Sequence, residues 1–262
     1  MSIISEAIKF LDKLYAEKKY KEQCDLFKVQ YNSKEYNNSE LMWRHARALR
    51  ELANNSKDKK EHDKLLNEGL NVAKNCLLID ENSSGCNKWY AFLLDLTGRI
   101  EGTKKRIENS YAVKKHLDIA TVKSNGTDVG ALHALGVWCY EITSLSWLNR
   151  KVAATFFATP PTSSYQESLK YLEAAEKISP GFYSQNYLYL GKVYEKMGKN
   201  GEAKEYLQKC VNYNSDDMDT VNPEHNRDSC GLKYTHQCII NIFRKMDKYI
   251  RMQMHPHSMY NV

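Results

Sequence analysis

The sequence has little glycine and little proline, and this shortage excludes several classes of protein. Its 262 residues include 12 Gly and 5 Pro. Collagen-like chains and low-complexity disordered chains contain far more of both residues. An all-β protein is also disfavoured, because its many tight turns depend on Gly and Pro. With 42% hydrophobic and 27% charged residues, the chain has the composition of a folded, water-soluble protein.

Paired cysteines and long apolar runs are lacking as well. The chain has 7 Cys, an odd number, and no two are spaced C-x-x-C. We therefore expect buried, reduced thiols in a reducing compartment rather than a disulfide framework or a zinc site. No apolar run approaches the roughly 20 residues that a membrane span requires, and residues 1–6 do not resemble a secretory signal. These absences predict a cytoplasmic chain without a transmembrane anchor.

Catalytic motifs are the third absence. The sequence contains no His-Glu-x-x-His, no Gly-rich phosphate loop and no nucleophile elbow. The closely spaced His255 and His257 belong to a chain end, which we interpret as solvated rather than metal-binding. We expect no enzyme activity, no cofactor and no metal. The mild formal charge of +6 comes without a nucleic-acid recognition motif, so nucleic acid is not an expected partner.

What the sequence does contain is a two-helix pattern that repeats at intervals of about 34 residues or more. The clearest copy places residues of the expected size at eight positions: Tyr187, Leu190, Gly191, Tyr194, Gly198, Ala203, Leu207 and Cys210. Their spacing follows the tetratricopeptide pattern W-x2-L-G-x2-Y followed by A-x3-F. In this pattern the small Gly191 and Ala203 let the two helices approach closely, while the larger residues fill the space between them.

Three weaker copies precede this one, and they begin at Trp43, Trp89 and Leu132. Insertions separate them, and the longest covers residues 145–165. Apolar residues also recur on one helical face near residues 3–18 and 234–250, at the two ends of the chain. A terminal helix that covers the last repeat is what a solenoid requires.

These patterns predict an all-α fold, a tetratricopeptide-like right-handed helical superhelix (an α-α solenoid). We expect residues 1–262 to form a single domain. It would carry the insertion 145–165 and a C-terminal capping helix at 232–251.

Several segments resemble the regulator of microtubule dynamics family. They are Leu41-x-Trp43-Arg44-x-Ala46-Arg47, Lys88-Trp-Tyr-Ala91, Leu135-Gly-Val-Trp-Cys-Tyr140 and Phe157-Ala-Thr-Pro-Pro161. The resemblance implies a tetratricopeptide-like fold, microtubule association and a role at the mitotic spindle. Some relatives carry a membrane anchor, and one is linked to membrane contact sites and lipid binding. Because this chain starts almost directly at its first helix, we expect a cytoskeletal role instead.

The predicted inner surface of the superhelix is one candidate binding site. In tetratricopeptide folds the first helix of each repeat lines this groove, which here gives Arg44, Arg47, Tyr90, His133, Tyr140, Gln185 and Lys192. Aromatic and cationic residues together suit an extended peptide or a helix with acidic groups. The alternative is a groove that the chain's own insertion, residues 151–164, fills.

Two basic stretches form the second candidate, at residues 99–123 and 233–251. Their candidate contact residues are Lys104, Lys105, Arg106, Lys114, Lys115, Arg244, Lys245 and Lys248. The outer surface and tails of tubulin are acidic, so these stretches could bind tubulin in a salt-sensitive manner. The alternative is an ordinary solvated helix face.

Together these readings predict a non-enzymatic, microtubule-associated scaffold at the cytoskeleton or spindle. Its expected partners are tubulin and an unknown protein or peptide. One alternative is a lipid-binding helical module of the membrane-contact-site type. A clamp for C-terminal carboxylates ranks last, because Asn87 and Lys192 are not in register on successive helices.

Overall fold

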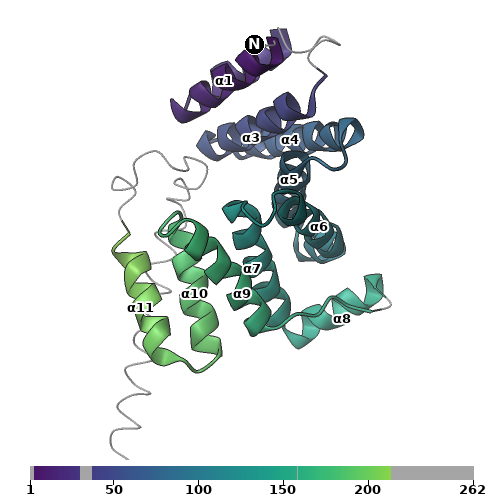
Figure 1. Cartoon of the computed structure of the whole chain (residues 1–262). Helices are drawn as coiled ribbons and strands as arrows, with labels where there is room; N and C mark the ends of the chain where they lie inside the picture. The colour runs from purple at the N-terminus through teal and green to yellow at the C-terminus, as the bar shows by residue number, and fades with distance from the viewer. Residues whose placement is uncertain (1–2, 30–36, 158, 214–262) are drawn as a thin grey trace, which may run out of the picture. The chain divides into compact units, whose positions relative to one another are not determined.

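A computed structural model describes residues 3–29, 37–157 and 159–213. The chain divides into two compact units, residues 1–164 and residues 165–262, and each is described by itself (Figure 1). The expected single domain over 1–262 stays a prediction. The expected capping helix at 232–251 and the His255–His257 pair lie outside the described residues.

The first unit consists of helices that pack in sequence order. They are α1 (Ile3–Ala16), α2 (Tyr20–Val29), α3 (Ser39–Asn55), α4 (Lys59–Ile79), α5 (Ser84–Glu101), α6 (Thr103–Lys123), α7 (Val129–Thr143) and α8 (Trp147–Phe156). From α1 to α7 each helix packs on the next, and α1 also packs on α3, as α3 does on α5 (Figure 1). Contacts between neighbours and between alternate helices are what stack helix pairs into an α-α solenoid.

The second unit contains α9 (Tyr165–Ile178), α10 (Ser184–Lys196) and α11 (Asn200–Val211). Helix α10 packs on both of the others. The described residues contain helices and no strand, so the expected all-α, tetratricopeptide-like fold class is confirmed. The residues that open the three weaker predicted repeats, Trp43, Trp89 and Leu132, lie on α3, α5 and α7.

Side chains that cap the helix N-termini explain where several helices begin. Asn38 and Asp58 accept hydrogen bonds from the backbone N–H groups two residues ahead, at the starts of α3 and α4. Ser83, Asp128 and Ser146 accept one from three residues ahead, at the starts of α5, α7 and α8. Each bond satisfies a backbone donor that has no partner within the helix, which typically stabilises the helix by about 1 kcal/mol.

Close helix approach at a glycine explains the clearest repeat. A Cβ atom added to Gly191 on α10 would lie 2.6 Å from Cγ of Leu207 and 3.3 Å from the carbonyl oxygen of Ala203, both on α11. Leu207 and Ala203 are completely buried. The expected role of Gly191 and Ala203 in letting the two helices approach is therefore confirmed.

The expectation of reduced thiols throughout is wrong for one pair. Cys76 near the end of α4 and Cys86 near the start of α5 form a disulfide, with Cα atoms 5.5 Å apart. The α4–α5 turn brings together two residues that are ten positions apart, and a search for C-x-x-C spacing does not detect such a pair. Cys24, Cys139 and Cys210 are buried thiols outside this disulfide, as expected.

Gly191→Ala is expected to lower the free energy of unfolding of the second unit. Overpacking a well-packed contact costs about 1–3 kcal/mol, and urea denaturation followed by circular dichroism measures the loss. Gly201→Ala on α11 is the matched control, because an added Cβ there meets nothing within 4 Å. The control should be neutral or stabilising by up to about 1 kcal/mol. Equal effects of the two substitutions would contradict the close-approach argument.

Candidate functional site

Both arginines of the predicted groove bind one aspartate of α1 inside the first unit. Arg44 Nε and Nη2 donate to the two carboxylate oxygens of Asp12, each at 2.9 Å. Arg47 Nη2 donates to Oδ1 of the same carboxylate, also at 2.9 Å. Arg44 is 8% exposed and Arg47 is 5% exposed. Both guanidinium groups therefore serve as contacts between α1 and α3.

Aromatic rings and a second carboxylate complete this cluster. The Arg44 guanidinium lies 4.0 Å from the ring centroid of Trp43, and that of Arg47 lies 3.7 Å from the ring centroid of Tyr15. Glu40 accepts hydrogen bonds from Arg44 Nη1 at 2.8 Å and from Trp43 Nε1 at 3.0 Å. The side chains of Asp12 and Glu40 remain 43% and 48% exposed. The exposed charged groups in this part of the predicted groove are therefore carboxylates, whereas the sequence predicted cations.

The third predicted groove residue, Tyr90 on α5, is half-buried against α6. Its ring meets the His116 ring edge to face, with centroids 4.6 Å apart. Nδ1 of His116 lies 2.7 Å from Oδ1 of the buried Asn87. Burial raises the pKa of Tyr90 and lowers the pKa of His116. This neutral polar cluster joins α5 to α6 and leaves part of the Tyr90 ring accessible.

The remaining groove candidates lie on two further helices. His133 and Tyr140 are half-buried on α7 of the first unit, and Gln185 and Lys192 are half-buried on α10 of the second unit. The Lys192 ammonium lies 4.7 Å from the ring centroid of Tyr189 on the same helix. Of the seven candidates, Arg44 and Arg47 are joined through Asp12. A continuous groove over all seven stays a prediction.

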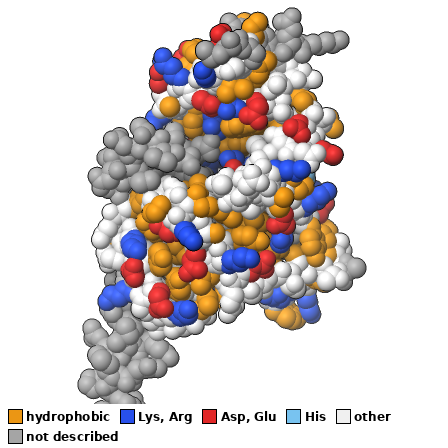
Figure 2. All heavy atoms as spheres, viewed as in Figure 1, with side chains coloured by type: hydrophobic (Ala, Val, Ile, Leu, Met, Phe, Trp, Pro, Cys, Tyr) orange, Lys and Arg blue, Asp and Glu red, His pale blue; other side chains and the backbone are white. Residues whose placement is uncertain are grey.

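The first predicted basic stretch lies along α6, where several of its charges already have partners. Lys114 pairs with Asp118 at 2.8 Å, and Lys105 pairs with Glu108 at 3.3 Å. Lys104 and Lys115 are exposed. Figure 2 shows basic and acidic side chains interspersed over this face of the molecule. Arg244, Lys245 and Lys248 of the second stretch lie outside the described residues.

Arg106 belongs to an ion-pair network that joins α5, α6 and α7. Its Nε lies 2.8 Å from Oδ1 of Asp95, and its Nη2 donates to Glu141. Arg99 binds the other oxygen of Asp95 at 2.8 Å. Burial opposes the charge of Asp95, but Arg99 and Arg106 outweigh it and lower its pKa. Arg106 therefore holds three helices together and contributes little free positive charge to the surface.

The described part of the predicted insertion contains a helix, α8, and packs on α6. The Tyr111 hydroxyl donates to the Thr159 carbonyl oxygen at 2.7 Å, and the Tyr111 ring meets the Phe157 ring with centroids 4.7 Å apart. The Lys104 ammonium lies 5.4 Å from the ring centroid of Phe156. These contacts fall on the second helix of a repeat, whereas the predicted groove is lined by first helices. Filling of the groove by residues 151–164 stays a prediction.

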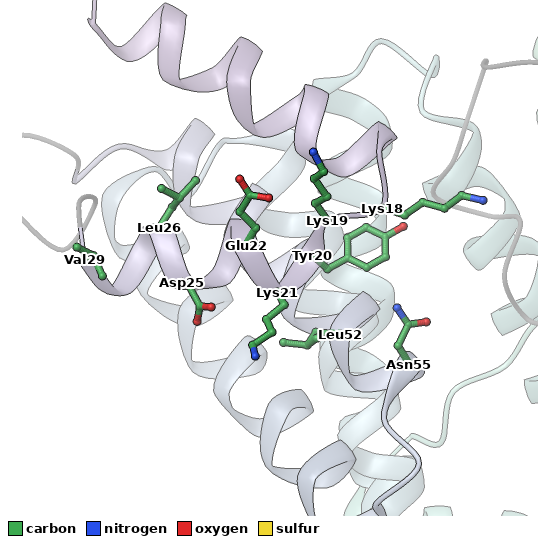
Figure 3. A pocket seen from close by; sticks show the side chains of 10 residues that line it. All are labelled: Lys18, Lys19, Tyr20, Lys21, Glu22, Asp25, Leu26, Val29, Leu52 and Asn55. Carbon is green, nitrogen blue, oxygen red and sulfur yellow. The ribbon is translucent and has the colours of Figure 1, made fainter.

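An open pocket of about 720 Å³ beside α2 was not anticipated from the sequence. Figure 3 shows it between side chains of the α1–α2 turn and α2 and those of Leu52 and Asn55 at the end of α3. Its rim has cations at Lys18, Lys19 and Lys21 but also carboxylates at Glu22 and Asp25. Charges of both signs give the pocket no clear preference for a ligand.

Sequence reasoning also missed the role of Asp12. A polar residue beside the apolar positions of a helix has no distinguishing signal until its arginine partners on another helix are known. Among residues 3–29, 37–157 and 159–213, no group of three or more His, Cys, Asp or Glu could hold a metal ion. None of the helices described there is long and apolar enough to cross a membrane.

The fold and its surfaces define a tetratricopeptide-like helical-repeat protein. Comparison with known sequences then gives the family. The profile described as "Regulator of microtubule dynamics protein 1-3" matches residues 7–229, so the chain belongs to this family.

Individual relatives agree with this assignment. Regulator of microtubule dynamics protein 1 of Mus musculus is 40% identical over 189 residues, which cover 72% of this chain and 62% of the relative. Regulator of microtubule dynamics protein 3 of Xenopus laevis is 32% identical over 64% of this chain and 36% of the relative. The chain thus matches less than two thirds of the length of these relatives. A crystal structure of MamA protein aligns with a TM-score of 0.48 and 16% identity, covering 79% of this chain and 89% of that chain.

Asp12→Ala is expected to destabilise the first unit, because it leaves two buried guanidinium groups without their shared carboxylate. Removing one partner of a buried ion pair costs about 3–5 kcal/mol. The partial exposure of Asp12 reduces the expected loss to about 1–3 kcal/mol. Asp25→Ala is the control, because Asp25 pairs with Lys28 at 3.9 Å on the exposed face of α2. Chemical denaturation should separate the two variants, and equal stability would contradict the role of Asp12.

Stability is also expected to fall in mild acid through His45 on α3. The His45 ring stacks on Phe27 of α2 with centroids 4.1 Å apart, and burial lowers its pKa to about 4. Between pH 6.5 and pH 4 the unfolded chain therefore binds more protons at this residue, so the free energy of unfolding decreases as the pH falls. The loss from His45 should reach about 2 kcal/mol at pH 5, since one pKa unit corresponds to about 1.4 kcal/mol.

His45→Phe keeps an aromatic ring against Phe27 and removes the titrating group. Urea denaturation at pH 7.5 and pH 5 should show a smaller loss of stability for the variant than for the wild-type chain. Parallel losses in the two proteins would mean that His45 does not contribute to the acid sensitivity.

Proposed function

We propose that this chain is a non-enzymatic scaffold that associates with microtubules and regulates them through protein–protein contacts, in the cytoplasm at the cytoskeleton or spindle. Membership of the regulator of microtubule dynamics family over residues 7–229 carries the proposal. Relatives bearing that name, and a fold made of stacked helix pairs, point to a regulator rather than an enzyme. No catalytic constellation was found in the sequence, which agrees with this proposal.

The exposed lysines of α6 support a more specific form of the proposal, in which they contact tubulin. Arg106 and Lys114 are bound by carboxylates within the chain. Lys104 and Lys115 are exposed, whereas Lys105 pairs with Glu108 at 3.3 Å. The acidic outer surface of tubulin would attract these side chains, and salt would weaken the attraction. The proposed tubulin contact is therefore narrower than the whole basic stretch 99–123.

The second proposed partner is an unidentified protein or peptide. The accessible parts of Tyr90, His133 and Tyr140 in the first unit, and of Gln185 and Lys192 in the second, are the proposed contact points. Aromatic and amide groups of this kind suit an extended peptide. The buried Arg44 and Arg47 would act indirectly, by holding the helices that carry the contact surface.

Microtubule co-sedimentation tests the proposed tubulin contact. The wild-type chain should pellet with assembled microtubules at low salt and less so at moderate salt. Lys104→Glu with Lys115→Glu should weaken pelleting on the order of tenfold, if each reversed charge changes the binding free energy by ~0.7 kcal/mol. The exposed Lys60 and Lys74 of α4 provide a matched control, Lys60→Glu with Lys74→Glu, that should bind as the wild type does.

Two results would count against this proposal. One is no pelleting of the wild-type chain at low salt. The other is pelleting that neither salt, nor removal of the tubulin tails by subtilisin, nor the α6 charge reversal reduces. In the second case the chain would bind microtubules through another surface.

A further inference from the structure

Two large apolar side chains are exposed next to each other at the start of α8. Trp147 is 68% exposed and Leu148 is 62% exposed. The other tryptophans of the chain, Trp43, Trp89 and Trp138, are buried or half-buried. An exposed apolar pair that includes the largest side chain indicates a contact surface more than a lone exposed residue does.

The charges near this pair along the chain have one sign. No Asp or Glu occurs between Glu141 and Glu167, although Arg150 and Lys151 do. Lys151 is exposed, and its ammonium lies 4.0 Å from the ring centroid of Trp147. Lys104 of α6 lies at the other end of this helix, 5.4 Å from the ring centroid of Phe156. Figure 2 shows hydrophobic and basic side chains mixed at the edge of the molecule where α8 lies.

Contacts with neighbouring helices hold α8, the helix that carries the pair, in place. Ala153 is 1% exposed. Arg150 Nη2 donates to the Thr143 carbonyl oxygen at 2.9 Å, at the end of α7, and Tyr111 binds the segment that follows α8. Arg150 is thereby oriented toward α7, which leaves Lys151 as the outward cation of α8. Contacts with α6 and α7 therefore hold in place the helix that carries Trp147, Leu148 and Lys151.

We propose that this surface, formed by Trp147, Leu148 and Lys151, docks the chain on an anionic lipid bilayer. Tryptophan and leucine beside lysine are the side chains that favour the boundary between lipid headgroups and acyl chains. The pair protrudes from a helix, so it suits a soft interface rather than a peptide that needs a groove. Trp147, Leu148 and Lys151 also cover too little area for a specific protein interface by themselves. The contact needs no internal lipid cavity and is independent of the proposed microtubule contact.

Vesicle flotation of the full chain tests the proposal. The wild-type chain should float with vesicles of phosphatidylcholine mixed with phosphatidylserine and should not float with phosphatidylcholine alone. Lys151→Glu should weaken binding by about fivefold or more, because each cation near an anionic bilayer contributes roughly that factor. Trp147→Ala with Leu148→Ala should weaken it by about tenfold or more. Leu78→Ala is the matched control, since Leu78 on α4 is 85% exposed and lies outside this surface.

Tryptophan fluorescence gives a second measurement that does not depend on affinity alone. Insertion of the exposed Trp147 should shift the emission to the blue when phosphatidylserine vesicles are added. Trp147→Phe should retain binding within about twofold, because Phe also enters the interface, but it should lose the shift.

Three outcomes would overturn the proposal. The wild-type chain does not bind anionic vesicles; the Trp147→Ala/Leu148→Ala variant binds them as well as Leu78→Ala does; or the emission shift persists in Trp147→Phe. If the double variant instead loses microtubule pelleting while vesicle binding is unchanged, the surface contacts a protein. That result would reject the membrane proposal and leave the microtubule proposal standing.

Discussion

The structure depends on how closely each helix can approach the next one along the chain. At Gly191 a single added carbon would overlap Leu207 of α11, and at Gly69 of α4 it would lie 3.2 Å from the Leu93 side chain of α5. Leu207 and Leu93 are completely buried at these contacts. At Gly98 of α5 an added carbon would lie 3.3 Å from Cα of Arg106 on α6, and the Asp95–Arg106 ion pair joins the same two helices. Close apolar packing and ion pairs therefore stabilise the same helix pair.

The sequence predicts local patterns well, but it does not predict which side chains meet between helices. The positions of Trp43, Trp89, Leu132 and Tyr187 in a repeated pattern are local information, and they place the first helix of each pair correctly. The partners of Arg44 and Arg47 are not local, because Asp12 lies on another helix and has no pattern of its own. The Cys76–Cys86 pair was missed for the same reason, since it depends on how α4 and α5 meet.

The candidate sites show the same limit: the sequence gives the type of each residue but not whether it lies at the surface or between helices. A count of lysines and arginines treats every cation in 99–123 as surface charge. In the structure Arg106 faces two carboxylates from other helices, while Lys104 and Lys115 stay exposed. A buried charge is stable only with a partner, so the cations that enter the helix interfaces are neutralised there. The cations outside the interfaces determine the electrostatic potential at the surface. They are fewer than the lysines and arginines counted in the sequence.

Helix α8 in the insertion uses its apolar residues differently from the repeat helices. Helices α1 to α7 continue the repeating pattern, and their apolar residues are used mainly to pack against neighbours. Helix α8 interrupts the pattern and packs on α6, so its apolar face is divided between the inner Ala153 and the outer Trp147 and Leu148. Water exposure of a tryptophan and a leucine opposes folding stability or at best does not aid it. An apolar pair in this position is therefore better explained by a contact outside the chain than by the stability of the fold.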